Sequence, residues 1–256
     1  MLRKSLLIVP SFIITSLLLL ISCDTGGISE SEYQIQYTRT AQLKNVYENK
    51  IITLSTSFIE KTTLLENNIQ EFKNETTTVN LIKAQESWVE TLKTWKQLEL
   101  YNLGAVENSF IHFEINRWAT NTEIIDKNIE GNETINEVYI TTKGSSSKGL
   151  SAIEYLLFSS NDDLEIVSSF TTEINFDRRF DYLIALSQNL RSKSIELLHL
   201  WESENENFVN STENGITGSQ NQLTNAMINL IEEIIISKLG NPLGDKTNGI
   251  IDANAL

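Results

Sequence analysis

Residues 81–98, LIKAQESWVETLKTWKQL, indicate the fold class. Their larger apolar side chains recur every three or four residues, at Leu81, Ala84, Trp88, Leu92, Trp95 and Leu98. This spacing places them on one face of an α-helix. Neither Gly nor Pro interrupts residues 28–103, so the helix can be long, and Gly104 is its expected C-cap. Tryptophans at helical spacing are expected in the core rather than against a ligand.

Three further segments show the same spacing, separated by loops such as KNETTT. Their apolar positions are Tyr47, Ile51, Leu54, Phe58, Leu65, Ile69 and Phe72; Phe180, Leu183, Leu190, Leu197 and Trp201; and Leu223, Met227, Leu230, Ile234 and Leu239. Residues 105–175 are more broken, and no alternating strand pattern with turn dipeptides occurs. The sequence therefore predicts an all-α fold, an antiparallel bundle of long helices.

The N-terminus is typical of a bacterial lipoprotein. Two basic residues, Arg3 and Lys4, precede the apolar run SLLIVPSFIITSLLLLI, and LISC ends at Cys23. We expect a signal peptide over residues 1–22, a lipidated Cys23 with a polar tether over 23–31, and one helical domain over 32–256. The alternative is an uncleaved membrane anchor, for which this run with its internal proline is short. The expected location is the bacterial cell envelope, with the lipid holding the protein on a membrane.

The charge of the chain excludes one class of partner. The chain has 34 acidic and 20 basic residues, a net charge of −14, and two of those bases lie in the expected leader. Because such an acidic surface repels the phosphates of nucleic acid, we expect no nucleic-acid partner. The single cysteine falls at the expected cleavage site, which leaves none for a disulfide elsewhere.

Four pieces of the chain, in order, resemble the imelysin-like family of bacterial envelope proteins. They are WKQLELYNLG (95–104), INRWATNTEIIDKNI (115–129), KGLSAIEYLLF (148–158) and FDRRFDYLIALSQNL (176–190), with LGNPLG following at 239–244. The resemblance implies two bundle-like halves with a site between them, built around a G-x-H-x-x-E motif. It also implies a link to iron uptake, in a family grouped with metallopeptidases. Members continue beyond the point where this chain ends, so we expect either a fragment or a member that lacks the C-terminal half, with an open site in both cases.

The motif departs from the family pattern at one position. It runs from Gly149 to Glu154, and Ser151 stands where the family has histidine. His and Glu at i and i+3 can chelate one cation, whereas a serine hydroxyl is a poor ligand for iron or zinc. Glu154 is then the remaining metal anchor, and zinc hydrolysis, which needs about three protein ligands, is disfavoured. A divalent or ferric ion stays the candidate cofactor.

The matched pieces supply the other candidates for the site. The complete set of ligand candidates is Glu154, Glu99, Ser151, Gly149, Trp118, Asn121, Arg178 and Arg179. Either arginine is expected to pair with one of the two glutamates. The alternatives are a solvated helix face for Glu99, packing for Trp118 and a surface salt bridge for the arginines. No catalytic residue is assigned.

The chain has two histidines, too few for a histidine-rich metal centre. His112 lies two residues before Glu114, and His199 lies three before Glu202 in a periodic helix. We expect structural roles for both histidines. The leading hypothesis is a non-enzymatic envelope lipoprotein that binds a ligand or metal and is linked to iron acquisition. A metallopeptidase-like enzyme and a structural or interaction module with an envelope protein partner are the alternatives.

Overall fold

The computed structural model describes residues 30–241, 243 and 244, with side chains from Thr38 onward. The chain divides into two compact units, Met1–Thr38 and Arg39–Leu256, and the fold below is that of the second. The predicted signal peptide and Cys23 lie outside the described residues. Within the described part, every regular element is helical and no helix is long and apolar enough to cross a membrane. The all-α prediction is confirmed.

The first long helical run consists of α2 (Glu30–Val46), a π-helical segment η1 (Tyr47–Ile52) and α3 (Thr53–Asn74). A short turn follows, and the Thr77 side chain accepts a hydrogen bond of 3.3 Å from the backbone N–H of Asn80. This N-cap begins α4 (Thr78–Leu98). The break predicted at KNETTT is confirmed.

The end of α4 corrects one prediction. The helix stops at Leu98 and passes into a 3₁₀ turn, η2 (Glu99–Tyr101). Gly104 has a left-handed backbone, with φ of +59°, as predicted for a cap, but it begins the next helix. The C-cap assigned to Gly104 is therefore wrong.

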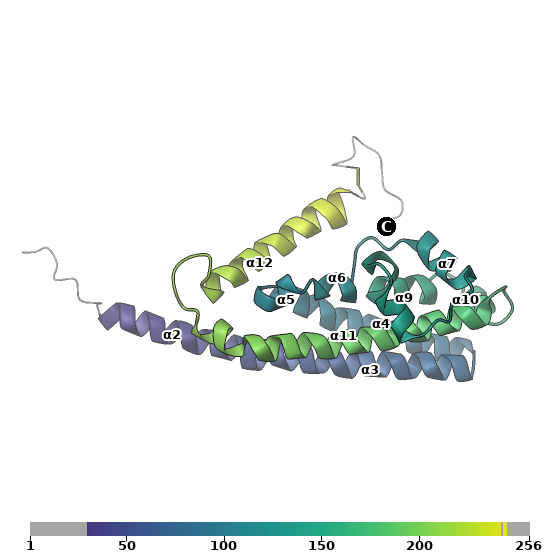
Figure 1. The fold of residues 1–256 in the computed structure, drawn as a ribbon, viewed down its shortest axis with the longest axis horizontal. Coiled ribbons are helices and arrows are strands. Elements are labelled where there is room, and N and C mark those ends of the chain that lie inside the picture. The colour runs from purple at the N-terminus through teal and green to yellow at the C-terminus, as the bar shows by residue number, and fades with distance from the viewer. Residues whose placement is uncertain (1–29, 242, 245–256) are drawn as a thin grey trace, which may run out of the picture. The chain divides into compact units, whose positions relative to one another are not determined.

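The core lies where α3 packs against both α4 and the longest helix, α11 (Phe176–Asn210) (Figure 1). Phe58 of α3 meets Trp95 of α4 with ring centroids 5.7 Å apart, and both side chains are buried. The hydroxyls of Thr62 and Ser194 share a buried hydrogen bond of 3.0 Å across α3 and α11. Trp88, Trp95 and Trp201 are all buried, which confirms them as core residues.

Shorter helices pack against α4 and α11 (Figure 1). They are α5 (Gly104–Asn108), α6 (Ile111–Ile115), α7 (Thr122–Glu130), α8 (Glu137–Thr141), the 3₁₀ turn η3 (Ser145–Ser147), α9 (Gly149–Leu157) and α10 (Asp163–Ser169). Their buried apolar residues join the same core as those of the long helices. The region that the sequence shows as broken is thus a set of short packed helices.

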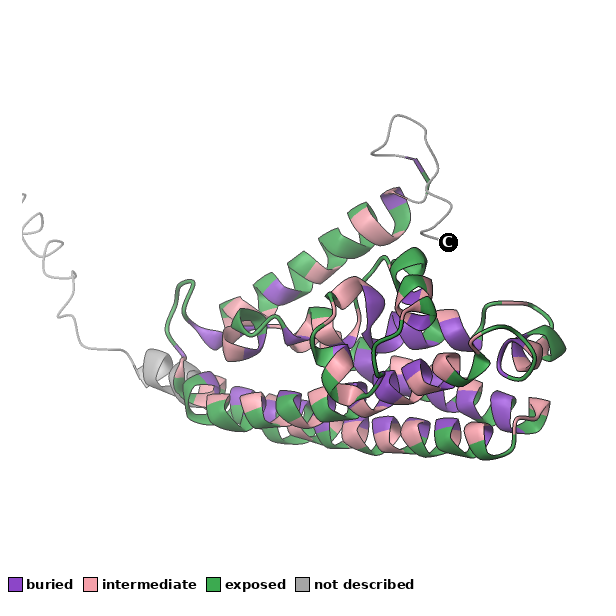
Figure 2. Ribbon diagram, turned by 45° about the vertical axis from the view of Figure 1, so that its right-hand side comes forward, coloured by how far each residue is buried: buried purple, intermediate pink, exposed green. Residues whose placement is uncertain are grey.

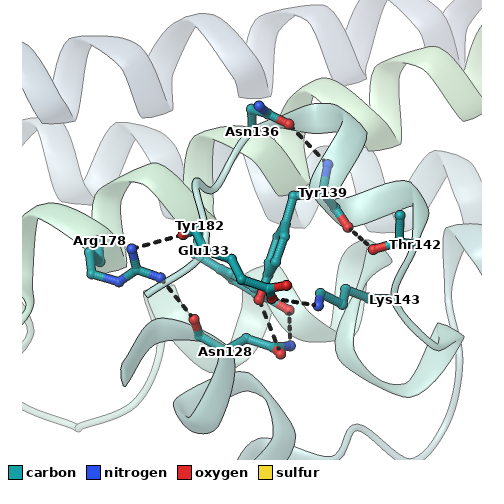
Figure 3. A network of polar contacts seen from close by, with 8 residues as sticks. All are labelled: Asn128, Glu133, Asn136, Tyr139, Thr142, Lys143, Arg178 and Tyr182. Carbon is teal, nitrogen blue, oxygen red and sulfur yellow. Dashed lines mark hydrogen bonds and ion pairs between the residues drawn. The ribbon is translucent and has the colours of Figure 1, made fainter. Parts of the chain in front are cut away.

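Polar contacts fasten α7 and the loop after it to α11 (Figure 3). The guanidinium of Arg178 donates to the backbone carbonyls of Ile129, Asn128 and Glu133, at 2.6, 3.2 and 3.0 Å. The Tyr182 hydroxyl accepts a hydrogen bond of 3.2 Å from the Asn128 amide. Arg178 therefore serves the C-terminal end of α7, and the predicted pairing of this arginine with a site glutamate is wrong.

The last helices pack differently from the rest. The predicted fourth helix is present as α12 (Ser219–Glu233) and a π-helical segment η4 (Ile234–Gly240). Only Ser219 and Ala226 of α12 are buried, and most of the helix is exposed (Figure 2). Met227 and Leu239 of the predicted apolar stripe are 48% and 54% exposed. That stripe is amphipathic in sequence but largely uncovered.

Candidate functional site

The matched motif forms the start of α9, which packs closely on the end of α6. Gly149 adopts a left-handed φ of +76°, and a Cβ there would lie 2.8 Å from the carbonyl oxygen of Glu114. Only glycine satisfies both conditions without strain. Beside it, the buried ammonium of Lys148 forms an ion pair with the Glu114 carboxylate. Gly149 thus sets the position of the motif helix.

Ser151, at the position of the motif histidine, binds the neighbouring loop. Its hydroxyl lies 2.6 Å from Oδ1 of Asn116 and 3.0 Å from the backbone carbonyl of Arg117. A hydroxyl carries one hydrogen, so these acceptors share a single donor. The side chain is buried, and its hydrogen bonds fix the segment that leads to Trp118. Ser151 is therefore a positioning residue for that loop.

One helical turn later, Glu154 faces a hollow of about 310 Å³, here called the Glu154 hollow. The hollow is lined by Trp118, Ala119, Thr120, Ser151, Glu154, Tyr155, Phe158 and Ser159. The Glu154 carboxylate makes no hydrogen bond or ion pair with any described residue. Although the residue is exposed, desolvation by the surrounding protein raises its pKa, and the charge of Lys96 opposes this in part. The raised pKa means that the environment disfavours the charged form of this carboxylate.

Tyr155 forms another wall of the Glu154 hollow, and its hydroxyl is already engaged. It donates to the Asp126 carboxylate, 2.9 Å and 3.1 Å from the two oxygens. Burial and the Asp126 charge raise the pKa of Tyr155 to about 12. The guanidinium of Arg179 lies 6.0 Å from the Tyr155 ring centroid and 5.1 Å from that of Phe170. The predicted pairing of Arg179 with a glutamate of the site is also wrong.

The other predicted residues separate into two groups. Trp118 is 44% exposed and lines the Glu154 hollow, so it is available to a ligand. Asn121 instead caps α7, accepting a hydrogen bond of 3.1 Å from the Ile124 N–H. Glu99 lines a different hollow and forms ion pairs with Lys96 and Lys238 at 2.9 and 3.2 Å. The structure therefore joins Gly149, Ser151, Glu154 and Trp118, and it leaves out Asn121 and Glu99.

The sequence analysis missed several residues that line these hollows. Tyr155 and Phe158 follow Glu154 by one and four residues in KGLSAIEYLLF. This spacing on the motif helix could have predicted that they line the same hollow as Glu154. His112, to which a structural role was assigned, lines the second hollow with Glu99. His199 lies on the exposed side of α11, with Nδ1 3.0 Å from the Glu202 carboxylate. No group of three or more His, Cys, Asp or Glu side chains among the described residues is arranged to hold a metal ion.

Comparisons with known proteins place these features in a family. The family model described as Imelysin matches residues 55–254. A solved structure of an imelysin-like protein from Psychrobacter arcticum 273-4 superimposes with a TM-score of 0.67 at 16% sequence identity. The alignment covers 82% of this chain and 65% of the solved chain. No curated protein sequence matches the chain.

The family match spans both the long helices and the motif helix, and the solved structure shares their all-α arrangement. At this identity the solved structure speaks for the fold alone, while the family model covers most of the sequence. The chain belongs to the imelysin family.

Proposed function

We propose that this protein is a non-enzymatic lipoprotein of the bacterial envelope that binds a positively charged ligand in the Glu154 hollow and serves iron acquisition. The observation that carries the proposal is the Glu154 carboxylate, which lines a hollow of about 310 Å³ without a partner among the described residues. Desolvation disfavours the charged form of this carboxylate, and a cationic ligand would favour it.

The walls of the hollow favour a cation with an apolar part. The exposed indole of Trp118 and the ring of Phe158 offer aromatic surface beside the carboxylate. A cation over an aromatic face gains about 0.5–2 kcal/mol, most where water is excluded. The hydroxyls of Thr120 and Ser159 add hydrogen-bonding groups at the same hollow. Ligand-binding sites commonly combine apolar walls with a few polar groups in this way.

The side chains of the motif argue against hydrolysis. Ser151 directs its hydroxyl at the Asn116–Arg117 segment, and Tyr155 directs its own at Asp126. Among the described residues, Glu154 is then the one carboxylate that lines the hollow, and its side chain makes no such hydrogen bond. A hydrolytic zinc site needs about three protein ligands. The donor set fits binding rather than catalysis.

The iron role rests on the family, whose association with iron uptake makes the ferric ion the first cargo to test. A ferric ion favours oxygen ligands, and Glu154 offers a free carboxylate. In this proposal the ion is cargo and not a resident cofactor.

The test measures ligand binding to purified protein by calorimetry, with ferric nitrilotriacetate, Zn²⁺ and benzylammonium as probes. We expect at least one of these cations to bind, and Glu154→Gln to weaken it about tenfold or more, since a charged hydrogen bond contributes roughly 1.5–3 kcal/mol. Glu130→Gln, an exposed glutamate at the end of α7, is the matched control and should change nothing. Equal binding by both variants, or none with any probe, would favour the interaction module instead.

The envelope address has a separate test. Cys23→Ala should abolish lipid labelling and release the protein from the membrane fraction, because the lipid is then the anchor. Unchanged membrane retention in this variant would show that the apolar leader itself is the anchor.

A further inference from the structure

A second hollow lies between α12 and the segment from η2 to Trp118. It has a volume of about 120 Å³, and we call it the His112 hollow. Trp118 lines both hollows, but the polar walls differ: here they include Glu99, Asn102, Glu107, His112 and Glu233. Because a single water needs roughly 10–15 Å³ of such space, the hollow has room for a group of several heavy atoms.

Several hydrogen-bond acceptors at this hollow are unused. Nδ1 of His112 and Oδ1 of Asn102 are shut off from solvent and make no hydrogen bond with any described residue. The Glu107 carboxylate is exposed and also has no such partner in the described part of the chain. The last torsion of histidine and asparagine is soft, so both enclosed atoms can turn toward the hollow. An unpaired buried polar atom costs about 1–3 kcal/mol, which a hydrogen-bond donor would recover.

The same wall already accepts one alkylammonium group. Nζ of Lys238 lies 3.2 Å from a carboxylate oxygen of Glu99 and 3.2 Å from one of Glu233. The two carboxylates are thus placed to receive a cation, and Lys238 supplies it from η4. Desolvation lowers the pKa of His112, against the opposing charges of the nearby glutamates, so the imidazole is neutral at pH 7 and able to accept.

We propose that the His112 hollow binds a small primary ammonium group, with Glu107 as its counter-charge and Asn102 and His112 as hydrogen-bond acceptors. A primary ammonium has three N–H donors and no acceptor, which matches these three unpaired acceptors. The side chains of the described residues are not grouped to hold a bare metal ion, so an organic cation fits this hollow better. This site uses a different carboxylate from the Glu154 hollow, although Trp118 lines both.

Proton NMR of the purified protein tests this site directly, because the chain has only two histidines. Adding ethylammonium should shift the imidazole signals of His112 in a saturable manner and leave those of His199, exposed on α11, unchanged. Tetramethylammonium, which has the same charge but no N–H donor, should bind at least about tenfold more weakly, since the hydrogen bonds to charged groups are lost.

Two variants separate this site from the Glu154 hollow. Glu107→Gln should weaken ethylammonium binding about tenfold, whereas Glu154→Gln should leave it unchanged. Glu107 is exposed, so its replacement should not prevent folding, and the unchanged remainder of the spectrum verifies that. A non-saturable shift, equal binding of the two cations, or no effect of Glu107→Gln would overturn the proposal. Weakening by Glu154→Gln alone would assign the amine to the other hollow and overturn it as well.

Discussion

Helix α11 and the α12–η4 segment are both amphipathic, yet they differ sharply in how much of their apolar side is covered. α11 contacts α3, α9, α8 and η1, and residues such as Leu190 and Trp201 are buried along it. α12 contacts mainly η2 and its own continuation η4, and Ala226 is its one buried apolar residue. Amphipathic spacing indicates which side of a helix would be buried, but not whether a partner element covers it.

The difference has an energetic meaning. Burying an apolar side chain contributes roughly 1.5–3 kcal/mol, so the contacts of α11 stabilise the whole domain. The isoleucines of α12 and η4 remain in large part exposed. Polar contacts join this segment to the rest of the domain, among them the ion pair of Lys238 with Glu99 and the hydrogen bond from Gln220 to Gln42. We therefore expect substitutions in α11 to act globally and substitutions in α12–η4 to act locally.

The largest effect should come from Trp201→Ala in α11. Trp201 is 1% exposed and its ring centroid lies 5.7 Å from that of Phe208. Removing the indole leaves a cavity and should lower the free energy of unfolding by about 3–5 kcal/mol. Denaturant unfolding followed by circular dichroism measures this. Met227→Ala in α12 is the control, and equal losses in the two variants would break the comparison.

Lys238→Met should have an intermediate and local effect. The variant leaves the Glu99 carboxylate, partly enclosed, with Lys96 as its one ion-pair partner among the described residues. We expect a loss of about 1–2 kcal/mol, less than for a fully buried pair. Hydrogen exchange should speed up in residues 219–240 and stay unchanged in α11. Lys193→Met, which breaks an ordinary surface pair with Glu196, should do neither.

Ile231→Ala should change the free energy of unfolding by no more than about 0.5 kcal/mol, because the side chain is 49% exposed. It should instead reduce the binding of a hydrophobic dye, since exposed apolar patches bind such dyes. Ile69→Ala on α3, where the isoleucine is fully buried, is the matched control and should cost about 2–5 kcal/mol. A loss of similar size at Ile231 would mean that α12 is covered in solution.

The smallest effect should be a pH dependence of the free energy of unfolding that arises from His112, which lies near α12. Desolvation lowers the pKa of His112 below its ordinary 6.5, although the charges of Glu233, Glu107 and Glu99 oppose this and that of Arg117 assists it. The unfolded chain then takes up the proton first, so the free energy of unfolding should fall as the pH drops below 6.5. Above that pH the imidazole is neutral in both states and contributes nothing.

An NMR titration of the His112 imidazole measures this pKa directly. We expect a value below 6.5, and His112→Gln should remove the corresponding part of the pH dependence of stability. A pKa of about 6.5 for His112 would show that α12 does not cover this side chain. Helix α12 would then contribute even less to the core, compared with α11, than the structure shows.

The helical fold could be predicted because its signals are local. The spacing of Leu81, Trp88 and Trp95 describes one helix face, and all three side chains are buried as expected. The end of α4 was not predictable in the same way. Gly104 has the conformation of a cap, but the chain had already left the α-helix at Leu98. A left-handed glycine serves the start of a segment as well as its end, and sequence does not distinguish the two.

The candidate site was likewise predictable only in part. Gly149 and Glu154 came from the motif, and the structure places both on α9 beside Trp118, which a matched piece supplied. The partners of Ser151 and Arg178, and the Tyr155 ring beside Arg179, did not follow from the sequence, because each lies far away along the chain. A serine in place of histidine predicts a weaker metal ligand, but it does not reveal that its hydroxyl binds the carbonyl of Arg117.

The sequence by itself determined the helical class, the family resemblance, the strongly acidic charge and the departure at Ser151, since each depends only on residue types and their spacing. The tertiary structure alone decided which polar groups are occupied and which are left open. Arg178 binds backbone carbonyls of α7 and the loop after it, while Glu154 and His112 face hollows. Hydrogen bonding and desolvation depend on neighbours in space, and for these side chains those neighbours come from other segments of the chain.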